Sequence, residues 1–185
     1  ELFKRLAREN IKTFIDNGVK KIIVSSPHCY HTFKNEYPEF RVDFEVIHIS
    51  QFIFQLIKDG KLEIKEEYAK KITYHDPCYL GRHNGVYDEP RDVLKAVPGL
   101  ELAELPEHGV DSLCCGGGGG RIWMETPKGE RFCDIRIEQA TGVGAEVLVT
   151  ACPYCITNFE DSRLNLELEE VIEVKDITEI IQEVI

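Results

Sequence analysis

Positive charge and long hydrophobic runs are the two features that this sequence lacks most clearly. Of its 185 residues, 22 are Lys or Arg and 33 are Asp or Glu, so the formal net charge is −11. A chain this acidic has little basic surface with which to hold a phosphate backbone, and we expect no nucleic-acid partner. No apolar run approaches the roughly 18–20 residues that a membrane-spanning helix needs, so we expect no membrane span in this sequence.

The sequence also has no signal-peptide pattern and no methionine at its start. Because it begins at Glu1, we expect a fragment of a longer protein. Its hydrophobic content of 43% and charged content of 30% are typical of a globular protein with one large domain or two small ones. We expect a cytoplasmic location, with any attachment to the cytoplasmic face of a membrane made by parts outside this sequence.

Cysteine, by contrast, is abundant, with seven residues. In a chain of cytosolic character, clustered cysteines indicate metal or redox ligands before they indicate disulfides. Most of them follow one spacing: a first cysteine, 35 residues, a Cys-Cys pair followed by glycine, 36 residues after the pair, and a Cys-x-x-Cys turn. The residues of this spacing, which we call the five cysteines, are Cys78, Cys114, Cys115, Cys152 and Cys155.

An internal repeat divides the chain. Residues 18–29 read GVKKIIVSSPHC and residues 144–155 read GAEVLVTACPYC, so equivalent positions lie 126 residues apart. A second pair of similar segments follows in the same order, ISQFIFQLI at 49–57 and ITEIIQEVI at 177–185. The first copy has no counterpart of residues from about 70 to 115. We therefore expect the tail of one module at residues 1–66 and one complete module at residues 67–185.

The apolar pattern predicts an α/β fold with parallel-sheet βαβ units. Short stretches rich in β-branched residues predict strands at 21–25, 71–74 and 147–150, with a weaker candidate at 43–47. Apolar residues at helical spacing predict helices at 2–15, 51–58, 91–97, 131–141, 156–164 and 179–184. Ser50 and Thr178 are the expected N-caps of two of these helices. In such folds functional residues gather at the carboxyl ends of strands, where the predicted elements place several cysteines.

The residue types around the five cysteines favour metal chemistry. Thiolates are soft, negatively charged ligands suited to iron–sulfur clusters and to zinc. The glycines after the cysteine pair, beginning with Gly116 and Gly117, let the backbone approach a bulky inorganic core and direct N–H groups at its sulfides. A zinc site uses four ligands, so a fifth cysteine is surplus to it. An iron–sulfur cluster is therefore the leading interpretation, with both glycines in its binding site.

Two other interpretations stay open. The first is a zinc-stabilised structural or docking module of a larger redox complex, with zinc in place of a cluster. The second is a thiol–disulfide enzyme that uses Cys152 and Cys155, although the other three cysteines then have no role.

The residues that flank the five cysteines resemble a known family. Residues 75–82 read HDPCYLGR, residues 114–119 read CCGGGG, and residues 151–155 read ACPYC. Together with the spacing, these motifs resemble the CCG, or cysteine-rich, domain of heterodisulfide reductase and related iron–sulfur oxidoreductases. The YDEP segment at 87–90 and the stretch CCGGGGGRIW at 114–123 are most similar to the membrane-associated branch that passes electrons from electron-transfer flavoprotein to menaquinone.

The resemblance implies that the chain is part of an iron–sulfur oxidoreductase. It also implies that the five cysteines hold one four-iron four-sulfur cluster, which is noncubane in heterodisulfide reductase. The implied activities are reduction of a disulfide and electron transfer to or from a quinone-linked chain. The implied partners are redox subunits or domains, with electron-transfer flavoprotein and a quinone-linked membrane domain as the candidates. The family usually carries two CCG modules in tandem, in agreement with the repeat.

The first copy departs from the family pattern at Ser26, the position that matches Cys152. A hydroxyl group is a poor iron ligand, so a five-cysteine cluster is not expected there. Cys29 either joins a different metal site, with His28 or His31 as a weaker candidate ligand, or has no ligand role. The repeat favours polar helix-start roles for the two histidines.

Residues outside the cysteine motifs have less specific expectations. Cys133 falls within a predicted helix, and we expect it to be a small buried hydrophobic residue rather than a ligand. His75 and Asp76 precede Cys78 at a strand end, where they either orient ligands or cap the following turn. Trp123, just after the glycines, is expected to pack against the site.

Overall fold

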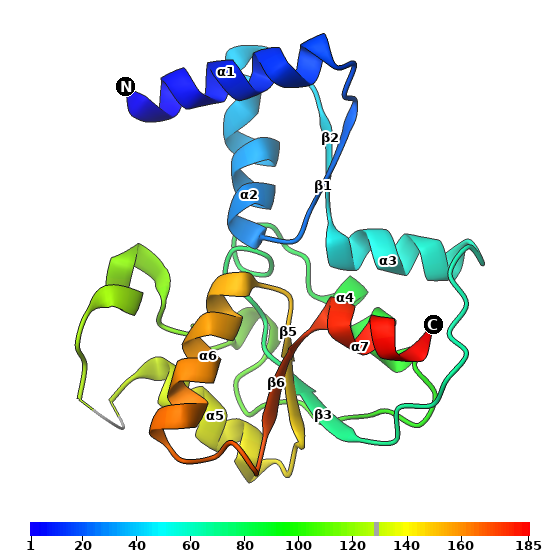
Figure 1. The fold of residues 1–185 in the computed structure, drawn as a ribbon, viewed down its shortest axis with the longest axis vertical. Helices are drawn as coiled ribbons and strands as arrows, with labels where there is room; N and C mark the ends of the chain where they lie inside the picture. The colour runs from blue at the N-terminus through cyan, green and yellow to red at the C-terminus, as the bar shows by residue number, and fades with distance from the viewer. Residues whose placement is uncertain (128–129) are drawn as a thin grey trace.

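The computed structural model describes residues 1–127 and 130–185 and contains two parallel sheets (Figure 1). The smaller sheet pairs β1 (Lys21–Val24) with β2 (Glu45–His48). The larger sheet has the order β4-β3-β5-β6, formed by β3 (Lys71–Tyr74), β4 (Glu101–Leu102), β5 (Val147–Thr150) and β6 (Glu173–Asp176). Every strand pair in these ranges is parallel and helices connect the strands, which confirms the predicted α/β fold.

The helices of the described ranges alternate with these strands. The α-helices are α1 (Leu2–Asp16), α2 (Pro27–His31), α3 (Ile49–Lys58), α4 (Asp88–Lys95), α5 (Phe132–Gly142), α6 (Pro153–Asn165) and α7 (Ile177–Val184). Shorter turns are the π-helical η1 (Thr32–Glu36) and the 3-10 segments η2 (Tyr37–Phe40), η3 (Gly109–Asp111) and η4 (Gly118–Trp123). No helix in the part of the chain that the structure describes is long and apolar enough to cross a membrane.

Strand β5 forms the centre of the core because its side chains are buried on both faces of the sheet. Val147 and Val149 pack with α4 and α7 on one face, whereas Leu148 packs with α5 and α6 on the other. This arrangement explains why the strand is continuously hydrophobic rather than alternating, as is typical of a parallel sheet covered on both sides. Helix α3 also packs against α4 and α7 and adds Ile53 to the first of these layers (Figure 1).

The repeat in the sequence is visible in the structure. The order β1-α2-β2-α3 in the first copy matches β5-α6-β6-α7 in the second (Figure 1). The turns before β1 and β5 contain equivalent glycines, Gly18 and Gly144, and both have a positive φ, of 65° and 74°. Both residues follow a helix, where glycine adopts this left-handed conformation without the steric penalty of a Cβ atom.

Two details of the predicted elements were wrong. The N-caps of α3 and α7 are His48 and Asp176, each two residues before the expected Ser50 and Thr178. Each cap accepts a backbone hydrogen bond and forms a capping box with the residue three positions later, which fixes the helix start. Strands β4 and β6 were not predicted, since β4 has only two residues and β6 alternates charged residues with a single buried valine, Val174.

Candidate metal centre

The five cysteines converge at the carboxyl ends of β3 and β5, the two central strands of the larger sheet. Cys78 lies in the loop after β3, the Cys114–Cys115 pair lies between η3 and η4, and the Cys-x-x-Cys turn begins α6 directly after β5. All five line one pocket with a volume of about 310 Å³. The structure thus brings together every residue of the spacing, at the edge where parallel sheets place their sites.

The five side chains contact one another in an unbroken series. The series of hydrogen-bonded neighbours runs Cys78, Cys114, Cys115, Cys155, Cys152. All five are free thiols. Cys115, Cys152 and Cys155 are buried, whereas Cys78 and Cys114 are partly exposed, so one end of the series is accessible from solvent.

These contacts shift neighbouring pKa values in opposite directions. Hydrogen bonds from Cys115 and Cys78 lower the pKa of Cys114 to about 2, and a hydrogen bond from Cys155 lowers the pKa of Cys152 to about 5. The contact with Cys114 raises the pKa of Cys115 to about 12, and the contact with Cys115 raises that of Cys155 well above its ordinary value. Thiolates this close together repel one another, and a cationic metal centre removes the conflict by favouring deprotonation of every ligand.

The glycine run shapes one wall of the pocket. The Gly116 N–H donates a hydrogen bond to Cys114 Sγ at 3.3 Å, and the Gly117 N–H donates one to Cys115. Gly116 has a φ of +82°, which disfavours any residue with a Cβ atom. A Cβ at Gly117 would lie 3.3 Å from the Asn158 amide nitrogen, which itself donates to the carbonyl oxygen of Cys115 at 2.5 Å. Both glycines therefore let the backbone run close to the sulfurs.

The first copy of the repeat also contributes to this pocket. His28, at the start of α2, lines the pocket and hydrogen-bonds to Cys152, which helps to lower the pKa of that thiol. Its ring lies 4.3 Å from the Tyr79 ring and 4.9 Å from the Tyr154 ring, measured between centroids. The weaker candidate His28 thus joins the pocket of the five cysteines, whereas Cys29 is exposed and does not line it.

His75 lies directly behind the sulfurs. It follows β3 and is fully buried, and burial together with the nearby Arg136 guanidinium lowers its pKa to about 3. One of its ring nitrogens and the sulfurs of Cys115 and Cys155 all lie within 4.8 Å of one another. The Arg136 Nε–H donates to His75 Nδ1 at 3.3 Å, and His75 Nε2 is buried without a hydrogen-bond partner. The edge of its ring contacts Phe159, at 4.7 Å between centroids.

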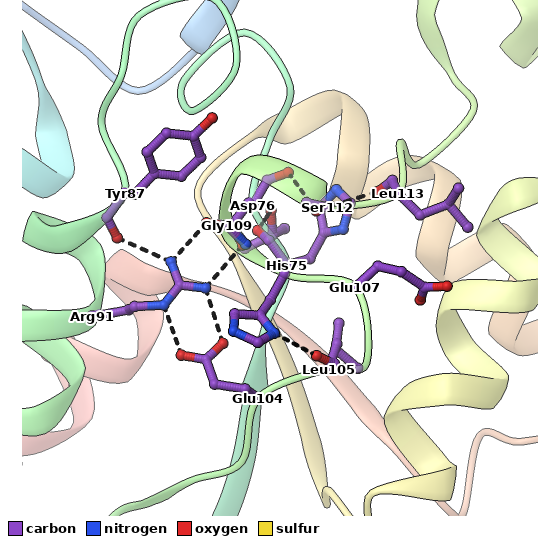
Figure 2. A network of polar contacts seen from close by, with 12 residues as sticks. His75, Asp76, Tyr87, Arg91, Glu104, Leu105, Glu107, Gly109, Ser112 and Leu113 are labelled. Atoms are coloured by element: carbon purple, nitrogen blue, oxygen red, sulfur yellow. Dashed lines mark hydrogen bonds and ion pairs between the residues drawn. The ribbon is translucent and has the colours of Figure 1, made fainter.

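A network of ionic hydrogen bonds holds the loop that carries Cys78 (Figure 2). The Arg91 guanidinium donates to both carboxylate oxygens of Asp76, at 2.7 and 2.9 Å, and to both of Glu104, at 2.7 and 2.9 Å. It also donates to the Tyr87 carbonyl oxygen at 3.0 Å, and the Gly109 N–H donates to Asp76 at 2.7 Å. Asp76 is therefore a structural anchor for the strand end, rather than a cap of the turn at Cys78.

The sequence analysis missed three polar residues that support the site. Arg91, Arg136 and Asn158 are all buried and all hold the segments that carry the cysteines or His75. No motif marks them, because each lies on a helix among ordinary polar residues. The expectation for Trp123 was wrong, since the side chain stands at the pocket rim but is 87% exposed. Cys133 is buried in the hydrophobic layer of α5 and α6, as expected.

Known proteins match both the repeat and the cysteine motifs. The family model for the CCG cysteine-rich domain matches residues 1–34 and 72–160. The probable iron-sulfur-binding oxidoreductase FadF of Bacillus subtilis is 44% identical over 180 residues, which are 97% of this chain and 26% of that protein. The EtfAB:quinone oxidoreductase of Syntrophomonas wolfei is 41% identical over 189 residues, which are again 97% of this chain and 26% of that protein.

A third relative comes from an archaeon. It is a polypeptide of the dihydromethanophenazine:CoB–CoM heterodisulfide reductase of Methanosarcina mazei, and it is 34% identical over 183 residues, 97% of this chain and 44% of that polypeptide. The chain therefore spans about a quarter of the first two relatives and less than half of the third. Because the family model covers more than half of the sequence, the chain belongs to the family of CCG cysteine-rich domains, whose members here are iron–sulfur oxidoreductases of electron transfer.

Proposed function

We propose that this chain is an electron-transfer module in which the five cysteines together hold one four-iron four-sulfur cluster of noncubane type. The observation that carries the proposal is the unbroken series of five thiols around a single pocket of about 310 Å³. Zinc needs only four ligands and leaves one of these thiols unused, so zinc is a substitute in iron-poor material rather than the resident metal.

Each part of the site has a distinct role in this proposal. The five thiolates bind iron, which supplies one-electron redox chemistry when it is bound. The N–H groups of Gly116 and Gly117 donate to the ligand sulfurs and so disperse their negative charge. His28, Tyr79 and Tyr154 surround the outer side of the pocket and limit the access of water to it. Arg91 and Asn158 keep the ligand loops in place.

The partners follow from the relatives. One relative is an EtfAB:quinone oxidoreductase and another is part of a heterodisulfide reductase, and the chain spans only a part of each. We propose that the whole protein passes electrons between electron-transfer flavoprotein and a quinone-linked membrane domain, with reduction of a disulfide as the second candidate activity. We also propose a location at the cytoplasmic face of a membrane, through parts of the protein outside this chain.

The first test is metal analysis of protein purified without oxygen. We expect iron and acid-labile sulfide in equal, cluster-like amounts, with visible absorption and a paramagnetic signal on reduction or oxidation. In a variant with Cys114→Ser and Cys115→Ser, both should be lost, since a hydroxyl is a poor iron ligand. The matched control is Cys29→Ser, which removes an exposed cysteine outside the pocket and should leave the iron content unchanged.

The outcomes separate the two metal assignments. Stoichiometric zinc without iron, persisting after anaerobic reconstitution with iron and sulfide, would show that the zinc-stabilised docking module is correct instead. Iron that survives in the double variant would show that the cysteine pair does not hold the cluster.

A further inference from the structure

The environment of His75 fixes which of its ring nitrogens carries the proton. Arg136 Nε lies 3.3 Å from His75 Nδ1, and a guanidinium group has N–H donors but no acceptor. Nδ1 must therefore present its lone pair to Arg136. Since Nδ1 is unprotonated, the ring is neutral and its one proton is on Nε2.

Arg136 is itself held rigidly, so this assignment does not depend on a mobile side chain. The residue is fully buried, and its Nη1 donates to the Glu107 carbonyl oxygen and to Gln139 Oε1, both at 2.8 Å. These contacts orient the guanidinium plane and aim Nε–H at the histidine. The protein thus sets the tautomer from the side of the ring that faces α5.

The protonated Nε2 has no hydrogen-bond partner among the described residues, although it is buried. An unsatisfied buried N–H is costly, and it marks a place where an acceptor is expected. The ring lies within 4.8 Å of Cys115 Sγ and Cys155 Sγ and interacts electrostatically with Cys114. Sulfur atoms of the site are therefore the acceptors within reach. A nitrogen that carries a proton offers no lone pair to a metal, so the same geometry excludes His75 as an iron ligand.

We propose that His75 is a positioning residue that tunes the reduction potential: its Nε2–H donates a hydrogen bond to sulfur at the cluster end formed by Cys115 and Cys155. This inference rests on the proposed function, because it assumes that the cysteines hold an iron–sulfur group. A hydrogen bond to sulfur stabilises the reduced, more negative state more than the oxidised state, and so raises the potential.

The test is a redox titration, followed by electron paramagnetic resonance, on anaerobically reconstituted protein. His75→Phe keeps an aromatic ring of similar size and removes the donor. We expect it to retain wild-type iron and sulfide content and to lower the equilibrium constant for one-electron reduction about tenfold, which corresponds to about 59 mV. His75→Asn retains an N–H donor and should recover part of the shift. The matched control is His108→Phe, because His108 is exposed and lies outside the pocket, and its potential should equal that of the wild type.

A second measurement needs no variant and so does not depend on folding of the substituted protein. Wild-type protein labelled with 15N-histidine should give a weak nitrogen coupling in pulsed electron paramagnetic resonance, as expected for a hydrogen-bonded ring. A strong coupling, or loss of iron from folded His75→Phe, would show that His75 is a ligand. An unchanged potential in iron-loaded His75→Phe would overturn this inference alone, whereas wild-type protein without iron and sulfide would overturn the proposed function as well.

Discussion

At the scale of single residues, the site depends on buried charges that hold its loops. Arg91 is the clearest example, because its side chain is only 10% exposed and satisfies two carboxylates at once. Burial of the pair with Asp76 contributes little net stability by itself, since desolvation of both charges offsets their attraction. Removing one partner is different, because the remaining charge is then buried without compensation.

We therefore expect Arg91→Met to destabilise the protein by about 3–5 kcal/mol, the usual cost of breaking a buried ion pair. The measurement is the free energy of unfolding in urea. The double variant Asp76→Asn, Arg91→Met should be more stable than the single variant, since it removes the stranded charge. If the two effects simply add, Asp76 and Arg91 are not energetically coupled.

At the scale of secondary-structure elements, the sequence predicted what depends on local pattern. The buried strands at 71–74 and 147–150 were correct because continuous β-branched runs need no tertiary information. The convergence of the five cysteines was also predictable, since parallel strands place their following loops at one edge. The approach of His28 to Cys152 and the contact of Arg136 with His75 were not, because both join elements distant in sequence through packing alone.

Helix α3 has a cap that responds to pH. His48 accepts a hydrogen bond from the Ser50 N–H, and its buried ring has a pKa lowered to about 4 from 6.5, mainly by desolvation. Below pH 6.5 the unfolded chain binds a proton here that the folded chain does not bind until about pH 4. The stability that this histidine permits is thus complete above pH 6.5 and falls as the pH drops to 4, by about 3 kcal/mol at 1.36 kcal/mol for each pKa unit.

The measurement is the free energy of unfolding between pH 7 and pH 4, compared with that of His48→Asn. Asparagine is a good N-cap but does not titrate, so the variant should lose this part of the pH dependence. Equal pH dependence in both proteins would show that another group is responsible.

At the scale of the whole molecule, the two copies of the repeat are not independent. Ile53 of α3 and Tyr30 of α2 belong to the same hydrophobic cluster as Tyr74 and Leu94 of the second copy. His28 adds a further contact at the metal pocket. The division into residues 1–66 and 67–185 remains our proposal for the module boundary, and the packing indicates that the two parts stabilise each other.

We expect a fragment of residues 67–185 to unfold at a lower urea concentration than the whole chain and to hold iron less tightly. Loss of the Ile53 side chain alone removes burial worth about 1.5–3 kcal/mol. The whole chain with Ile53→Ala serves as the matched comparison and should fall between the two. A fragment as stable as the whole chain would show that the second module folds on its own.

The exposed side chain at the pocket rim has a practical consequence. Trp123 is the single tryptophan of the sequence, and it stands beside the five cysteines with most of its surface in solvent. Iron–sulfur chromophores absorb where indole emits, so a bound cluster would quench this one fluorophore by energy transfer. The protein therefore carries its own optical reporter, and loading or loss of the metal group can be followed in real time without any added label.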